Sequence, residues 1–271
     1  MKFWRLDRPK CDDYRSAFAN GALEHPYRLP EIKCKVCGGG NCGDDRVLPY
    51  ECPVAWRTRK FKDPKPVSLA KFNHLVKELQ GSVSSTVRLP DSMIRPWCDL
   101  QPCFLDIPSK PTTDFLWCYS GSVSVSERVK NLFEELKVAD VAFAPVIMRK
   151  VGARPAKLPP PMPSTGEPED IINEVSVRKF PKTGNRYYEL IVLAKSKPPP
   201  SRIPTFICSV CGAKKVDWTS RKPLMMRPSM WTGAEIFYIA TTGYLLITAN
   251  LRKHLLRLRP SNVDIQEFVS A

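Results

Sequence analysis

The 271-residue sequence lacks the short motifs that mark common catalytic sites. It contains no glycine-rich phosphate-binding loop, no His-Glu-x-x-His and no Gly-x-Ser-x-Gly. Histidine is scarce, and His25, His74 and His254 stand far apart and beside no nucleophile motif. Paired carboxylates such as Asp44 and Asp45 are adjacent in sequence, which directs them apart on a helix or strand. These absences predict a protein that is not an enzyme.

Apolar runs long enough to cross a membrane are also missing. The longest run, residues 236–251, is shorter than the roughly 20 residues that a membrane span needs, and Gly243 interrupts it. Residues 1–18 carry charges throughout and contain no apolar core of a signal peptide. The sequence therefore predicts a cytoplasmic protein without membrane association.

Acidic residues are few relative to basic ones. The chain has 42 Lys and Arg against 27 Asp and Glu, which gives a net charge of +15. Such a surface attracts nucleic acid, anionic membrane or an acidic protein partner, and charge alone does not choose among them. The basic residues are scattered rather than gathered in one tail, so a solvated basic surface and a specific nucleic-acid groove stay open as interpretations.

The 27 prolines mark the boundaries along the chain. Residues 152–168 and 196–204 are proline-rich, which is typical of semi-rigid connectors. Between them, two β-rich runs flank the sequence PKTGN and predict a hairpin. We therefore expect an N-terminal half over residues 1–150, connectors enclosing a hairpin over 151–204, and a C-terminal half over 205–271, with a single domain as the alternative.

Two segments of the chain repeat one pattern. Residues 114–146 and 236–268 each predict an aromatic-rich strand, a glycine turn, a second strand, a helix-capping Ser126 or Thr248, an amphipathic helix and a final strand. The aligned residues are Phe115, Gly121, Val125, Ser126 and Val141 in the first segment and Phe237, Gly243, Ile247, Thr248 and Val263 in the second. The repeat predicts an α+β fold with two similar strand-helix-strand halves.

The ten cysteines include two Cys-x-x-Cys-Gly turns, residues 34–38 and 208–212, each upstream of one repeated segment. Such a turn places two sulfurs on the same side of a tight loop, and its glycine supplies a positive φ. Zinc takes four thiolates in a tetrahedron whatever their separation in sequence. We therefore expect the two halves to be joined through a shared zinc ribbon with the ligands Cys34, Cys37, Cys208 and Cys211.

Other cysteine arrangements stay open. Cys42 and Cys52 could complete a local metal site with the first turn, leaving the second turn to bind elsewhere. A thioredoxin-like pair needs its first cysteine at a helix N-terminus, which the glycine-rich first turn disfavours and the second turn permits. Thiols packed as small apolar groups without metal are a further alternative. Cys98, Cys103 and Cys118 lack ligand-type spacing, and we expect them to be buried.

The sequence resembles the myxobacterial double-CXXCG proteins, a set named for two turns like CKVCG and CSVCG here. The similarity runs nearly end to end, through MKFWRL, PVSLAKFNHL, RVKNLFEELKVADVAFAPV and the closing strand-helix-strand. The resemblance implies a cytoplasmic, non-catalytic protein, and some members resemble immunity proteins that are encoded beside a toxin and neutralise it by direct binding. The residues that match the naming motifs are Cys34, Cys37, Gly38, Cys208, Cys211 and Gly212.

The net charge departs from what this resemblance implies. Immunity proteins against nucleases are often acidic because they mimic nucleic acid, whereas this chain is strongly basic. The departure favours a toxin with an acidic surface or a role outside immunity. The alternative function is a nucleic-acid-binding zinc-ribbon protein that uses its basic surface. A thiol oxidoreductase, the third candidate, requires a reactive thiol of low pKa at Cys34 or Cys208.

Overall fold

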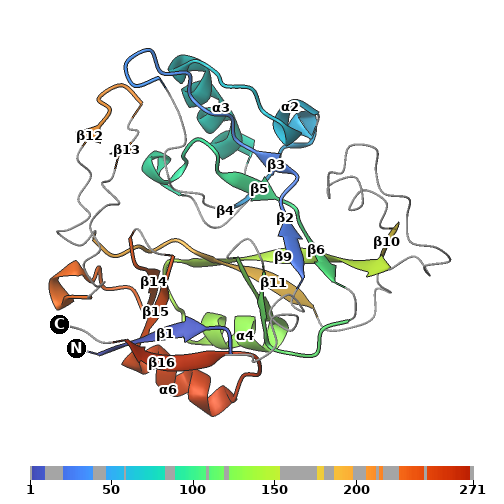
Figure 1. Cartoon of the computed structure of the whole chain (residues 1–271), viewed down its shortest axis with the longest axis vertical. Helices are drawn as coiled ribbons and strands as arrows, with labels where there is room; N and C mark the ends of the chain where they lie inside the picture. The colour runs from blue at the N-terminus through green and yellow to red at the C-terminus, as the bar shows by residue number, and fades with distance from the viewer. Residues whose placement is uncertain are drawn as a thin grey trace, which may run out of the picture.

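The computed structural model describes residues 2–9, 21–38, 47–57, 59–82, 89–107, 110–118, 122–152, 176–179, 186–197, 206–211, 214–215, 226–240 and 243–268. These residues form a mixed fold of helices and strands, which confirms the expected α+β class. A seven-stranded sheet runs through the middle of the molecule, with a four-stranded sheet on one side and a part that carries the cysteine turns on the other (Figure 1).

The seven-stranded sheet brings together strands from most of the chain. Across the sheet the strands are β2 (Ala22–Glu24), β6 (Cys103–Ile107), β9 (Val141–Gly152), β11 (Tyr187–Val192), β8 (Val123–Ser126) and β7 (Phe115–Trp117), and β10 (Ser176–Lys179) pairs with the far end of β9. β6 and β9 are parallel, and the other pairs are antiparallel. β10 and β11, which flank the expected PKTGN connection, both pair with β9, and that connection lies outside the described residues.

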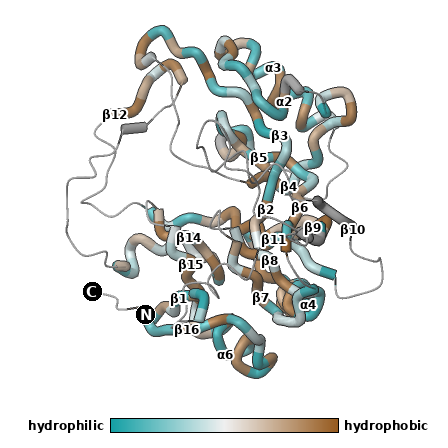
Figure 2. Tube along the Cα trace, turned by 45° about the vertical axis from the view of Figure 1, so that its right-hand side comes forward, coloured by the Kyte–Doolittle hydropathy of each residue, from teal (hydrophilic) through white to brown (hydrophobic). Residues whose placement is uncertain are grey.

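Strand β11 supplies apolar side chains to both faces of this sheet. Because successive side chains of a strand point to opposite faces, Leu190 and Val192 pack with Phe133 of helix α4 (Glu127–Glu135), while Ile191 packs toward the cysteine-bearing part. Hydrophobic residues accordingly gather around β8 and β11 in Figure 2. Glu189 differs from these apolar residues, because it places a carboxylate in the buried part of the strand.

The four-stranded sheet joins the two ends of the described chain. Its strands, in order, are β14 (Ile236–Tyr238), β15 (Leu245–Thr248), β1 (Phe3–Asp7) and β16 (Asp264–Phe268), all antiparallel. Helix α6 (Ala249–Leu258) covers it and packs Leu251 and Leu255 into the apolar cluster that also contains residues of α4. One core therefore connects this sheet to the seven-stranded sheet.

The part that carries the cysteine turns combines a small sheet with helices. The sheet has the order β3 (Tyr27–Arg28), β5 (Asp99–Gln101) and β4 (Val47–Glu51), the helices are α2 (Arg59–Lys62) and α3 (Leu69–Ser82), and the short 3-10 turns are η1 (Val54–Trp56) and η2 (Asp91–Met93). Helix α3 buries Phe72, Leu75, Val76 and Leu79 against the sheet. Strands β12 (Phe206–Ile207) and β13 (Lys214–Lys215) form a separate pair, and η4 (Pro228–Met230) leads to β14.

The two capping residues expected from sequence behave differently. Thr248 precedes α6, and its hydroxyl accepts a hydrogen bond from the amide of Leu251 at 3.5 Å, as expected. Ser126 also precedes a helix, α4, but its side chain makes no capping bond. Its hydroxyl instead donates to Asp114 Oδ1 at 2.8 Å, so the expected cap was wrong: this bond to a charged acceptor holds the side chain, and its oxygen accepts no amide of the first helical turn.

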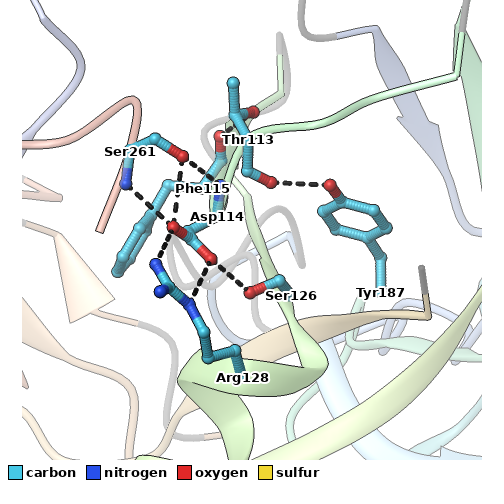
Figure 3. Close-up of polar contacts among 7 residues, drawn as sticks. All are labelled: Thr113, Asp114, Phe115, Ser126, Arg128, Tyr187 and Ser261. Atoms are coloured by element: carbon cyan, nitrogen blue, oxygen red, sulfur yellow. Dashed lines mark hydrogen bonds and ion pairs between the residues drawn. The ribbon is translucent and has the colours of Figure 1, made fainter. Parts of the chain in front are cut away.

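Asp114 connects the start of α4 to the turn between α6 and β16 (Figure 3). Its carboxylate accepts two hydrogen bonds from Arg128, at 2.6 and 3.2 Å, and two from Ser261, at 2.9 Å from the amide and 3.1 Å from the hydroxyl. Burial opposes the charge, but the bonds from Arg128, Ser261 and Ser126 outweigh it and lower the pKa of Asp114. The carboxylate therefore stabilises the contact between the two sheets in its ionised form.

Replacement of Asp114 by Asn tests this contact. We expect Asp114→Asn to lower the free energy of unfolding at neutral pH by about 2 kcal/mol, because it weakens several bonds to a charged group. The folded-state pKa lies below the unfolded value, so the contribution is present above the unfolded pKa and is lost as the pH falls. Urea unfolding at neutral pH and below pH about 4 should show a deficit that shrinks in acid.

Glu134→Gln is the matched control for this measurement. Glu134 forms an exposed ion pair with Lys130 one helical turn away, and exposed pairs contribute little to stability. A deficit for Asp114→Asn that is the same at both pH values, or no larger than that of the control, would contradict the proposed role of the ionised carboxylate.

Candidate metal centre

The first cysteine turn follows a short bridge between two segments of the cysteine-bearing part. Ile32 forms a parallel bridge with Val67, and the amide of Lys33 donates to Val67 O at 2.7 Å. The chain then turns through residues 35–37, and Gly38 has a φ of 81°, as the sequence predicted for this glycine. Among the described residues no heavy atom lies within 4 Å of where a Cβ would stand at Gly38, so the positive φ is what favours glycine there.

The second cysteine turn lies directly against the first, as the loop of residues 31–38 and strand β12 show in Figure 1. Cys34 Sγ lies 3.7 Å from Cys208 Sγ, and Cys37 Sγ lies 3.4 Å from Cys211 Sγ. All four sulfurs lie within 4.8 Å of one another. Sulfurs bound to one tetrahedral zinc ion lie about 3.8 Å apart, given Zn–S bonds of about 2.3 Å. The four cysteines are therefore close enough to hold a metal ion.

The turns also favour the thiolate form of their first cysteines. Hydrogen bonds from the amides of Cys37 and Val36 lower the pKa of Cys34, and those from Cys211 and Val210 lower the pKa of Cys208 to about 6. The thiolate is the form that binds a metal. Backbone geometry alone thus prepares two of the four sulfurs for this role.

The remaining described cysteines have a different environment. Cys52, Cys98, Cys103 and Cys118 are buried, as expected for the last three. Burial raises the pKa of Cys52 to about 11, which favours the neutral thiol. Cys52 also stands outside the group of four sulfurs that share one site, and Cys42 lies outside the described residues.

A second group of potential ligands has no motif or spacing signal in the sequence. His25, Cys103 and Glu189 each offer one ligand atom, and these atoms lie within 4.8 Å of one another. Burial and the nearby charge of Glu189 raise the pKa of Cys103 well above its ordinary value. Burial opposes the charge on His25, but the hydrogen bond to Glu189 outweighs it and raises the pKa of His25. The one sequence signal is a lone carboxylate in the apolar run YYELIVL.

No protein-family model matches the chain, and no curated protein matches it. None of the helices in the described residues combines the length and apolar character needed to pass through a membrane. Fold and site together define a class, an α+β protein with a cluster of four cysteines able to hold a metal ion.

Removal of one thiol from the four-cysteine cluster tests its role. We expect Cys208→Ser to lose one equivalent of bound metal and to lower the melting temperature, because metal binding and folding are linked. Elemental analysis of the purified chain and a thermal melt measure the two effects. Cys52→Ser is the matched control, since it makes the same chemical change at a buried thiol of the same apolar cluster. Equal metal content in both variants would argue against a site at Cys208.

Proposed function

We propose that the four cysteines hold one structural zinc ion. Four thiolates satisfy the tetrahedral preference of zinc and leave no open position for a substrate. The sulfur separations of 3.4 and 3.7 Å, close to the edge of such a tetrahedron, support this proposal. The ion would tie residues 34–37 to residues 208–211 and so stabilise both turns.

We also propose that the chain contains two similar halves that exchange one strand. In the two sheets the orders β7-β8-β11-β9 and β14-β15-β1-β16 match, and in each a helix follows the second strand. β1 precedes the first cysteine turn and β11 precedes the second, yet each lies in the sheet of the other segment. Each proposed half would thus run from a leading strand through a cysteine turn to a strand-strand-helix-strand unit.

We propose that the protein is a non-catalytic, immunity-type protein that neutralises a cognate protein toxin by direct binding. The observation that carries this proposal is a set of exposed apolar side chains on the two adjacent turns and on β12, here named the knuckle patch: Val36, Phe206, Ile207 and Val210. Val36 is 63% exposed and Ile207 is 57% exposed. Exposed apolar side chains on adjacent turns are typical of protein contact surfaces.

The surroundings of the knuckle patch favour an acidic protein as the partner. Lys33 and Lys35, which flank the first cysteine of the turn that carries Val36, are both exposed. An apolar centre with a basic rim complements a surface of the opposite charge around apolar residues. This arrangement agrees with the net charge of +15 and with a toxin that is not a basic nuclease.

Binding to the product of the adjacent gene tests the proposed function. We expect tight binding, and we expect Val36→Glu and Ile207→Glu each to weaken it by about tenfold or more, since both place a charge in an apolar contact. Calorimetry with the purified proteins measures the affinity, and growth of cells that express the adjacent gene reports neutralisation. Leu256→Glu is the matched control, because Leu256 is an exposed apolar residue on α6.

The nucleic-acid alternative predicts different results in the same experiments. An affinity for DNA or RNA that falls steeply with salt and does not depend on an intact knuckle patch would replace the protein-binding proposal. An adjacent gene product that neither binds the chain nor becomes harmless in its presence would contradict immunity.

A further inference from the structure

A buried carboxylate lies in the middle of the seven-stranded sheet. Glu189 is on β11, between Ser124 of β8 and Ala144 of β9, and its side chain is 2% exposed. A carboxylate in such a place is costly unless it is paired or coordinates a metal. The neighbouring side chains therefore determine whether Glu189 is paired in a hydrogen-bonded cluster or binds a metal ion.

The partners of Glu189 come from three other elements. Glu189 Oε2 accepts hydrogen bonds from His25 Nε2 and from Gln101 Nε2, both at 2.9 Å. His25 follows β2, Gln101 ends β5 and Cys103 begins β6, and the thiol of Cys103 lies beside the carboxylate. The side chain of His25 is 4% exposed, so the cluster is closed to solvent.

The side-chain oxygen of Gln101, next to Glu189, has no hydrogen-bond partner among the described residues. Gln101 is buried, and its Oε1 accepts no hydrogen bond from any described residue although its Nε2 binds Glu189. Reversal of the amide would set Oε1 against the carboxylate, which is unfavourable because both are acceptors. A buried polar atom without a partner requires an explanation, and a bound ion is one of the ordinary ones.

We propose that His25, Cys103 and Glu189 form a second metal site, for Zn²⁺, with Gln101 Oε1 beside it. An imidazole nitrogen, a thiolate and a carboxylate oxygen are the three ligand types that proteins offer to zinc. The thiolate disfavours Mg²⁺ and Ca²⁺, which prefer oxygen ligands alone. The side chains of His25 and Glu189 are 4% and 2% exposed and Cys103 is fully buried, which indicates a structural ion rather than a catalytic one.

The geometry and the charge of the cluster both accommodate the ion. Nitrogen and oxygen ligands bound to tetrahedral zinc lie about 3.4 Å apart, so the separation of His25 Nε2 and Glu189 Oε2 would widen by about 0.5 Å. In the metal-free cluster with a charged His25, the ion displaces two protons. One is the thiol proton of Cys103, and the other is the proton shared between His25 and Glu189. Two protons leave as two positive charges enter, and the buried cluster keeps its net charge with no group oxidised or reduced.

The site would connect parts of the chain that the four-cysteine cluster does not. Gln101 and β5 belong to the small sheet of the cysteine-bearing part, whereas β6 and β11 belong to the seven-stranded sheet. The proposed ligands follow β2 or lie on β6 and β11, so an ion here would brace the seven-stranded sheet at the place where it meets the small sheet. This inference stands apart from the proposed toxin binding, because it concerns only residues buried beneath the surface.

Zinc content of the full chain and of one histidine variant tests the proposal. We expect His25→Gln to hold one zinc equivalent fewer than the natural chain, because a glutamine amide still donates to Glu189 but binds zinc poorly. His74→Gln is the matched control, since His74 is exposed on α3, and we expect it to keep the full zinc content. Elemental analysis after gel filtration, with circular dichroism to confirm folding, supplies the readout.

A second pair of variants keeps the test decisive where one variant fails to fold. Cys103→Ser should also lose one equivalent, while Cys118→Ser, at a buried thiol of the same apolar cluster, should lose none. Both comparisons are differences from the natural chain, so they hold whether or not the four-cysteine cluster is filled. Zinc contents of His25→Gln and Cys103→Ser equal to that of the natural chain would identify a buried ion pair only and overturn the proposal.

Discussion

The sulfurs of Cys34 and Cys208 lie 3.7 Å apart although 174 residues separate them along the chain. The path of the chain between these two cysteines must therefore bring their sulfurs together. The chain must leave the first turn, build the central sheet and return to the same place before it completes the four-stranded sheet. A cross-link that closes a loop of this length removes about 5 kcal/mol of conformational freedom from the unfolded chain. A metal ion at the turns would supply such a link in a protein without disulfides among its described cysteines.

Completion of each sheet depends on a strand from elsewhere in the chain. β1 fills the place between β15 and β16, and β11 fills the place between β8 and β9. Since one apolar cluster contains residues of both α4 and α6, neither sheet can bury its core alone. The Asp114 carboxylate adds a polar contact between the same two parts. The two sheets and the cysteine turns are consequently interdependent, and we expect them to fold together.

Local features of this structure could be predicted from sequence, and contacts that depend on distant partners could not. The apolar spacing of residues 127–135 and 249–258 predicted both helices, and the Cys-x-x-Cys-Gly pattern predicted the positive φ of Gly38, because each signal lies within a few residues. The predicted capping bond of Ser126 was wrong because its side chain is held instead by the hydrogen bond that it donates to Asp114, twelve residues earlier. No spacing rule joins His25, Cys103 and Glu189, which meet only through the order of strands in the sheet.

The position of the knuckle patch follows from the geometry of the cysteine turns. When two cysteines of a Cys-x-x-Cys turn point inward to a common centre, the residues between them are forced outward. Val36 and Val210 occupy these outward positions, and both are exposed. The same turns that bring four sulfurs together thus present apolar side chains to solvent on a backbone with little freedom to rearrange. Rigid presentation lowers the entropic cost of binding a partner. The proposed structural metal ion and the proposed protein contact surface would therefore be two consequences of one arrangement, and loss of the ion would loosen the surface that the proposed partner contacts.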